Sequence, residues 1–172
     1  MSPRPSALQR EIRQRRPFRS VRHEGALGLL RTADLLRRQA ARVVEPHGLT
    51  LQQYNVLRIL RGAGAEGLPT LEIADRMIEH SPGITRLLDR VEGKGLVRRE
   101  RCPHDRRQVL CFILPAGLAL LARLDEPVTA TDETLLGRLS AAEVGRLIRL
   151  LDVVRSSQSS TWSPKDKTRR ES

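Results

Sequence analysis

The sequence of 172 residues predicts a mainly α fold with one small β-hairpin. Apolar residues recur at intervals of three and four through most of the chain, which is the pattern of amphipathic helices. Clusters of Gly, Pro and Ser separate these segments. Between residues 96 and 114, two apolar runs instead flank a polar bend, as in a hairpin. Because 39% of the residues are hydrophobic, the chain can bury one core of ordinary size.

The net charge of the chain limits the classes of molecule that it is expected to bind. A formal net charge of +11 favours a polyanion, and this charge alone fits nucleic acid and acidic membrane equally. The chain has no run of about 18 apolar residues, and residues 1–22 lack the apolar core of a signal peptide. Two cysteines form no disulfide framework and fit a reducing compartment. We therefore expect a cytoplasmic protein with no membrane partner.

Residues 1–22 form a basic arm with seven Arg and one Glu. This composition is also that of an organelle transit peptide, but a basic arm on a nucleic-acid-binding protein explains it equally well. A capping box predicts a short helix over Ser6–Ile12. The arm either extends a dimer interface or follows phosphates, and the burial that Leu8, Ile12 and Phe18 require favours the interface.

Two helices should follow the arm. Apolar positions at helical spacing predict a long helix over residues 24–46, which ends at Pro46-His47-Gly48. Thr50 and Gln53 form a second capping box, which opens a compact helix that ends at Gly62.

The next segments predict a helix-turn-helix. One helix spans Thr70–Ile78, and a second begins at once, with Ser81 as its cap and Pro82 at its first helical position. Two helices joined by so short a turn are typical of this motif.

A hairpin follows the second helix of the motif. Leu96-Val97 and Val109–Leu114 read as its strands, with the bend at Pro103-His104-Asp105. Residues 94–107 hold six basic and two acidic side chains, so this segment carries a local charge of +4. A winged helix-turn-helix over residues 68–114 is the predicted DNA-binding core.

The end of the chain divides into two parts. Residues 115–155 read as helices too apolar to stand alone. Residues 156–172 are rich in Ser and charge, which predicts a disordered basic tail.

The second helix of the motif supplies the predicted DNA readers. With Ile84, Leu87, Leu88 and Val91 inward, the residues that point outward are Pro82, Thr85, Arg86, Asp89 and Arg90. Arg86 is the first choice for a guanine contact, beside Thr85 and Arg90. Ser81 and the free N–H groups after it suit a phosphate, and Gly83 allows close approach of the backbone.

The hairpin supplies a second predicted contact. Arg98, Arg106 and Arg107 carry its charge, and the last two lie at the expected tip, where a narrow minor groove attracts arginine. Asp105 is expected to orient a neighbouring arginine and so to fix the wing. A solvated charged turn is the alternative for a hairpin without a helix-turn-helix beside it.

This arrangement resembles the MarR family of winged helix-turn-helix regulators, over about Glu24–Arg155. The resemblance rests on Glu72-Ile73-Ala74, on the run from Ser81 to Val97, on Asp105-Arg106-Arg107 and on Pro115-Ala116-Gly117. It implies one domain over residues 23–155, with dimerisation helices at 24–46 and 115–155. It also implies an obligate homodimer on a palindromic operator of double-stranded DNA, and repression relieved by a small-molecule effector. The effector pocket implied by the resemblance would use His47 and Tyr54.

Other readings of the same residues stay open. Cys102 and Cys111 lie on opposite strands of the hairpin and could form a disulfide in a redox sensor, although Cys111 also suits a small inward position. His23, His47, His80 and His104 are scattered without a metal-binding pair, so we expect no metal, although a metal sensor stays possible. A further rival is a winged-helix module that binds acidic protein and has no operator. No nucleophile with its base, phosphate-binding loop or carboxylate pair is present, so we expect neither an enzyme nor a cofactor.

Overall fold

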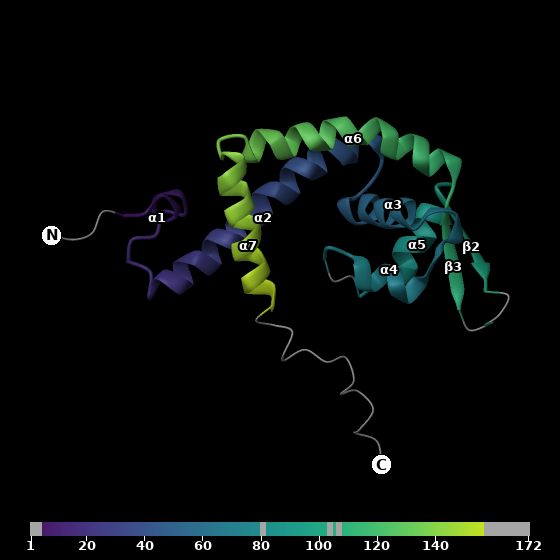
Figure 1. The fold of residues 1–172 in the computed structure, drawn as a ribbon, viewed down its shortest axis with the longest axis horizontal. Helices are drawn as coiled ribbons and strands as arrows, with labels where there is room; N and C mark the ends of the chain where they lie inside the picture. The colour runs from purple at the N-terminus through teal and green to yellow at the C-terminus, as the bar shows by residue number, and fades with distance from the viewer. Residues whose placement is uncertain (1–4, 80–81, 103–104, 106–107, 157–172) are drawn as a thin grey trace, which may run out of the picture. The chain divides into compact units, whose positions relative to one another are not determined.

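The computed structural model describes residues 5–79, 82–102, 105 and 108–156 (Figure 1). The chain divides into two compact units, Met1–Thr131 and Asp132–Ser172. The elements before the first strand are α1 (Ala7–Glu11), α2 (Val21–Val44), the 3-10 helix η1 (Glu45–His47), α3 (Leu51–Ala63) and the 3-10 helix η2 (Gly64–Glu66). The elements that follow are β1 (Leu68–Pro69), α4 (Thr70–Arg76), α5 (Ile84–Glu92), β2 (Val97–Arg101), β3 (Val109–Ile113), α6 (Pro115–Leu136) and α7 (Ala141–Ser156). The predicted tail lies outside the described residues, except for Ser156, which ends α7.

The expected fold class is confirmed, with one strand more than the sequence indicated. The sheet has the strand order β1-β3-β2, and both pairs are antiparallel. Leu68 of β1 pairs with Cys111 of β3, and Val97 of β2 pairs with Ile113. The hairpin of β2 and β3 is the predicted wing, and β1 joins it to the start of α4.

Side-chain hydrogen bonds cap α1, α2 and α3. The caps of α1 and α3 are the predicted ones, whereas α2 begins at Val21, three residues before the predicted start. The Ser6 hydroxyl accepts a hydrogen bond from the Gln9 N–H at 3.1 Å, and the Ser20 hydroxyl does the same for the His23 N–H. Thr50 and Gln53 form the predicted capping box at α3. These caps satisfy N–H groups that no helical carbonyl can reach.

The core of the first unit lies between helices α3, α5 and α6 and the sheet. Its side chains are almost fully excluded from solvent and include Leu57, Leu60, Leu88, Val91, Leu121 and Leu124. Gly117 lets α6 approach the strands, because a Cβ atom there would lie 2.6 Å from the Leu96 carbonyl oxygen. The winged elements and the first turns of α6 therefore form one packed body. None of the helices in the described ranges is long and apolar enough to cross a bilayer.

A bidentate ion pair joins α3 to α6 beside this core. Arg61 donates to both carboxylate oxygens of Asp125, at 2.8 and 2.9 Å. The hydrogen bond from Arg61 holds the pKa of Asp125 below its ordinary value. A carboxylate with a lowered pKa stabilises the fold at pH values above its unfolded pKa, and this stabilisation is lost as the pH falls through the folded pKa.

Asp125→Asn should lower the free energy of unfolding at pH 7 by about 0.5–1 kcal/mol, because the pair is half-exposed. The difference from the unsubstituted chain should shrink as the pH falls from about 4 through the lowered folded pKa of Asp125, because the wild-type carboxyl is neutral below that pKa. Urea unfolding at a series of pH values measures it. Glu126→Gln, at an exposed neighbouring carboxylate, is the control. A difference that does not change with pH would contradict the assignment.

Candidate nucleic-acid interface

Helix α5 has one buried face and one exposed face. Leu87, Leu88 and Val91 are at most 6% exposed. The exposed residues are Thr85, Arg86, Asp89 and Arg90, as their spacing predicts. The helix therefore presents two arginines and a threonine outward while its apolar face fixes it on the core. The predicted orientation is confirmed, and the contacts with DNA remain a prediction.

The start of α5 differs from the expectation. The helix begins at Ile84, and Pro82 lies in the preceding turn instead of at the first helical position. Gly83 is the N-cap, in a non-helical conformation at φ −120° and ψ 37°, and among the described residues no side chain caps the helix. Ser81 lies outside the described residues. A Cβ atom at Gly83 would meet nothing within 4 Å, so the first turn of α5 is open to a close partner.

The turn before α5 is held from two neighbouring helices. Helix α4 ends at Arg76, two residues earlier than expected, because Met77 is extended at ψ 137°. The Ile78 N–H donates to Asn55 Oδ1 on α3 at 2.9 Å. Glu79 pairs with Arg37 on α2 at 3.2 Å. The turn is thus tied to both α2 and α3.

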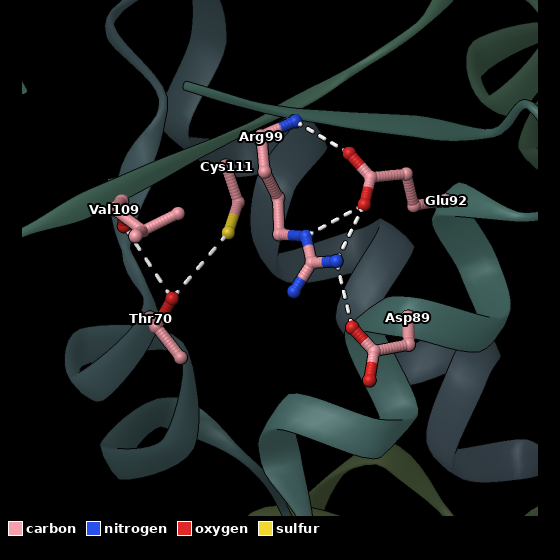
Figure 2. Close-up of polar contacts among 6 residues, drawn as sticks. All are labelled: Thr70, Asp89, Glu92, Arg99, Val109 and Cys111. Atoms are coloured by element: carbon pink, nitrogen blue, oxygen red, sulfur yellow. Dashed lines mark hydrogen bonds and ion pairs between the residues drawn. The ribbon is translucent and has the colours of Figure 1, made fainter. Parts of the chain in front are cut away.

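Arg99 joins the wing to α5, as Figure 2 shows. Its backbone N–H donates to Glu92 Oε1 at 3.0 Å, and its Nε donates to Glu92 Oε2 at 2.7 Å. Its Nη2 lies 2.6 Å from Asp89 Oδ1. We call Arg99, Glu92 and Asp89 the wing lock. The Arg99 side chain is only 25% exposed, and the hydrogen bond from its guanidinium to Glu92 raises the pKa of Arg99.

In the sequence, Arg99 contributed only to the predicted local charge of the wing, and this role was not predicted. Lys94, counted in the same group, also has protein partners. Its Nζ donates to the Gly48 carbonyl and to Gln53 Oε1, the latter at 3.0 Å. A carboxylate seven residues before Arg99 was the available signal, but only the hairpin geometry brings the two together.

Of the other residues predicted to act in the wing, the structure describes Arg98 and Asp105. Arg98 is exposed, with its guanidinium carbon 4.2 Å from the Phe112 ring centroid and an ion pair to Glu100. Asp105 binds Gln108, whose N–H donates to the Asp105 carbonyl at 2.9 Å and whose Nε2 donates to its carboxylate at 3.2 Å. These bonds join Asp105 to the residue that precedes β3. The predicted tip residues, Arg106 and Arg107, lie outside the described residues.

A pocket of about 560 Å³ lies beside the wing lock. Its lining residues are Pro69, Thr70, Leu71, Glu72, Asp75, Thr85, Arg99, Gln108 and Val109. The pocket therefore touches both the exposed face of α5, through Thr85, and the lock, through Arg99.

The two residues predicted for an effector pocket lie elsewhere. Tyr54 is 7% exposed in the core, and the Arg58 guanidinium carbon lies 5.9 Å from its ring centroid. His47 is exposed in η1. Neither residue lines the pocket beside the wing lock. Within the described ranges, no group of three or more His, Cys, Asp or Glu side chains could hold a metal ion.

The two cysteines are free and far apart along the hairpin. Cys111 is fully buried, as expected, and burial raises the pKa of its thiol. Cys111 pairs in register with Arg99, whereas Cys102 follows the end of β2 and its N–H donates to the Gln108 carbonyl. Three register positions correspond to roughly 10 Å along a strand. A disulfide between the two would therefore require the hairpin to change its pairing.

Comparisons with known proteins match this chain to transcriptional regulators. A family profile described as MarR family matches residues 49–109. A transcriptional regulatory protein for the hcr operon of Thauera aromatica is 35% identical over 115 residues, which are 66% of this chain and 68% of that protein.

Two solved structures are similar to most of this chain. The crystal structure of a MarR transcription factor from Planctomyces limnophilus is 44% identical, with a TM-score of 0.61, and the match covers 80% of this chain and 99% of that one. The MepR–DNA complex from S. aureus is 22% identical, with a TM-score of 0.71, over 77% of this chain and 96% of that chain. The second likeness concerns the fold alone.

The burial of Cys111 predicts unequal thiol reactivity. In the native protein at pH 8, Cys102 should react with a disulfide reagent rapidly, and Cys111 should react only after denaturation, because its thiol is buried and its pKa is raised. Counting the thiols released with time measures this, and Cys102→Ser identifies the fast group. Two equally fast thiols would contradict the described packing.

The wing lock predicts a loss of stability specific to Arg99. Arg99→Met should lower the free energy of unfolding by about 1–2 kcal/mol, because it removes charge-assisted hydrogen bonds and leaves Glu92 without its partner. Arg101→Met, at an exposed arginine of the same strand, should change it by less than about 0.5 kcal/mol. Urea unfolding compares the two. Equal effects would show that Arg99 is an ordinary surface residue.

Proposed function

This chain belongs to the MarR family of transcriptional regulators, and from that premise we propose that it works as a homodimeric repressor on a palindromic operator. A small-molecule effector then relieves the repression. The chain is a DNA-binding regulator, and its family and fold are not those of an enzyme.

The two-faced helix α5 is the observation that carries the proposal. An α-helix fits the major groove of DNA, where arginine can donate two hydrogen bonds to guanine and threonine can contact a thymine methyl group. Arg86, Thr85 and Arg90 occupy the exposed face that would enter the groove. We assign base recognition to Arg86 first, with Thr85 and Arg90 beside it.

Two further parts of the winged domain would contact the DNA backbone. The open first turn of α5, with Pro82 and Gly83 and with Ser81 before them, suits a phosphate because its N–H groups carry partial positive charge. Arg98, together with Arg106 and Arg107, would follow the adjacent minor groove. The wing lock supports simultaneous contact by α5 and by the wing, since it holds the two elements together.

Exposed apolar side chains support the homodimer. On α2, Leu29 and Leu30 are 41% and 64% exposed. On α7, Ile148 and Val153 are 53% and 67% exposed. Large apolar groups repeated along a helix favour burial against another chain. We propose that both helices belong to the dimer interface.

The pocket beside the wing lock supports the effector. A molecule bound there would touch Thr85 on the proposed reading helix and Arg99 in the lock. An effector that binds one arrangement of these two groups more tightly than another would shift the protein toward it. We therefore propose this pocket for the effector, in place of His47 and Tyr54.

Arg86→Ala tests the assignment to α5. On a duplex selected for binding, it should weaken affinity about 10- to 100-fold and relax base preference at one position in each half-site. Arg123→Ala, at an exposed arginine of α6, should change neither. Fluorescence anisotropy on the selected duplex and on single-base variants measures both effects. If Arg86→Ala binds with unchanged affinity and preference, α5 is not the reading helix.

A further inference from the structure

The arm before α2 carries positive charge that plays no part in the DNA contacts proposed for α5 and the wing. Residues 5–22 contain six Arg and one Glu. The Glu11 carboxylate pairs with Arg31 of α2 at 2.9 Å, so its charge is already balanced. Within the described part of the chain, the structure records no ion pair for the side chains of Arg13, Arg15, Arg16, Arg19 or Arg22. Among these described residues, five like charges lie within ten positions without a compensating carboxylate.

Hydrogen bonds within the arm fix the backbone that carries these arginines. Gln9 donates from Nε2 to the carbonyls of Gln14 and Arg16, both at 3.3 Å, and Gln14 donates to the Arg16 carbonyl at 2.9 Å. Arg13 takes a left-handed conformation at φ 54°, which turns the chain after α1. The side-chain amides thus satisfy the carbonyls of the turn, and the guanidinium groups are left for another partner.

Two of the three apolar side chains that favoured a dimer role for the arm contact residues of the same chain. Leu8 packs on α2, with its Cδ2 3.9 Å from the position of a Cβ atom at Gly28. The Phe18 ring contacts His23 edge to face, with 6.2 Å between the centroids. Leu8 and Phe18 are thus half-buried within one protomer, whereas Ile12 is 39% exposed, so the burial requirement that favoured a dimer role is met only in part. The five arginine side chains are the larger group that the arm leaves for a partner.

The arm lies on the same helix that holds the helix-turn-helix. Its anchors on α2 are Gly28 and Arg31, and Arg37 of α2 pairs with Glu79 in the turn before α5. Six to nine helical residues correspond to roughly 9–14 Å along the axis. The arm is thus attached within about one or two Debye lengths of the turn.

We propose that the arm binds phosphates of the DNA that flanks each operator half-site. Guanidinium groups match phosphate oxygens bidentately, and a cluster of them without carboxylates fits a polyanion. DNA is favoured over other polyanions because operator binding holds the flanking duplex close to the arm, which raises its effective concentration. This inference rests on the proposed operator contact by α5.

The test compares two duplexes and two full-length variants. One duplex is the selected operator alone, and the other adds flanks of roughly one helical turn, about 10 base pairs, on each side. The arm variant carries Arg15→Gln and Arg16→Gln. The control variant loses the same charge at two exposed arginines outside α2 and α7, with Arg123→Gln on α6 and Arg138→Gln after it.

The unsubstituted chain should bind the long duplex more tightly than the short one, and the arm variant should lose most of that advantage. On the long duplex, the slope of log affinity against log salt should fall by about 0.9 for each phosphate that the arm no longer neutralises. Affinity for the short duplex should change much less, and the control variant should keep the length advantage.

Three results would overturn the proposal. The arm variant could keep the full length advantage and salt slope, it could dissociate in sedimentation, which would indicate a dimer role, or it could lose only binding to anionic phosphatidylserine vesicles. The outcome is separable from the proposed function of α5, because a failure of α5 appears on the short duplex and a failure of the arm appears only on the long one.

Discussion

The wing lock is the interaction on which the rest of the proposed DNA-binding surface depends. Glu92 accepts both a backbone and a side-chain hydrogen bond from Arg99, and Asp89 pairs with the same guanidinium. A two-stranded hairpin is marginal by itself. Because Arg99 ties β2 to the last turns of α5, the wing and the helix form one unit that can present side chains to two grooves at fixed separation.

The unit of α5 and the wing is held by contacts on the side that faces the core, and its outer face is exposed to solvent. Asn55 and Arg37 hold the turn before α5, and Gly117 lets α6 pack closely on the strand that enters the wing. The outer face instead carries exposed Thr85, Arg86 and Arg90 and a helix start that no side chain caps in the described part of the chain. A supported inner side and an exposed outer face suit the binding of DNA, because rigid support lowers the entropic cost of ordering the side chains that make contact.

Sequence reasoning predicted the parts that depend on local periodicity. The two faces of α5 follow from the 3.6-residue repeat, and the start of α3 follows from its capping box. It missed β1, because two residues paired with a distant strand leave no periodic signal. It placed the start of α5 too early, because Pro82 and Gly83 suit a turn as well as a helix start. It did not predict the partners of Arg99 and Lys94, since these groups come together only through tertiary structure.

The central claim is that α5 and the wing of each protomer read one half of a palindromic site. Selection of DNA by the full chain from a random pool tests this most directly. The account predicts an enriched palindrome whose half-site centres lie about one helical turn, roughly 10 base pairs, apart. A pool with no enriched sequence, or one with a single site that lacks two-fold symmetry, would contradict it.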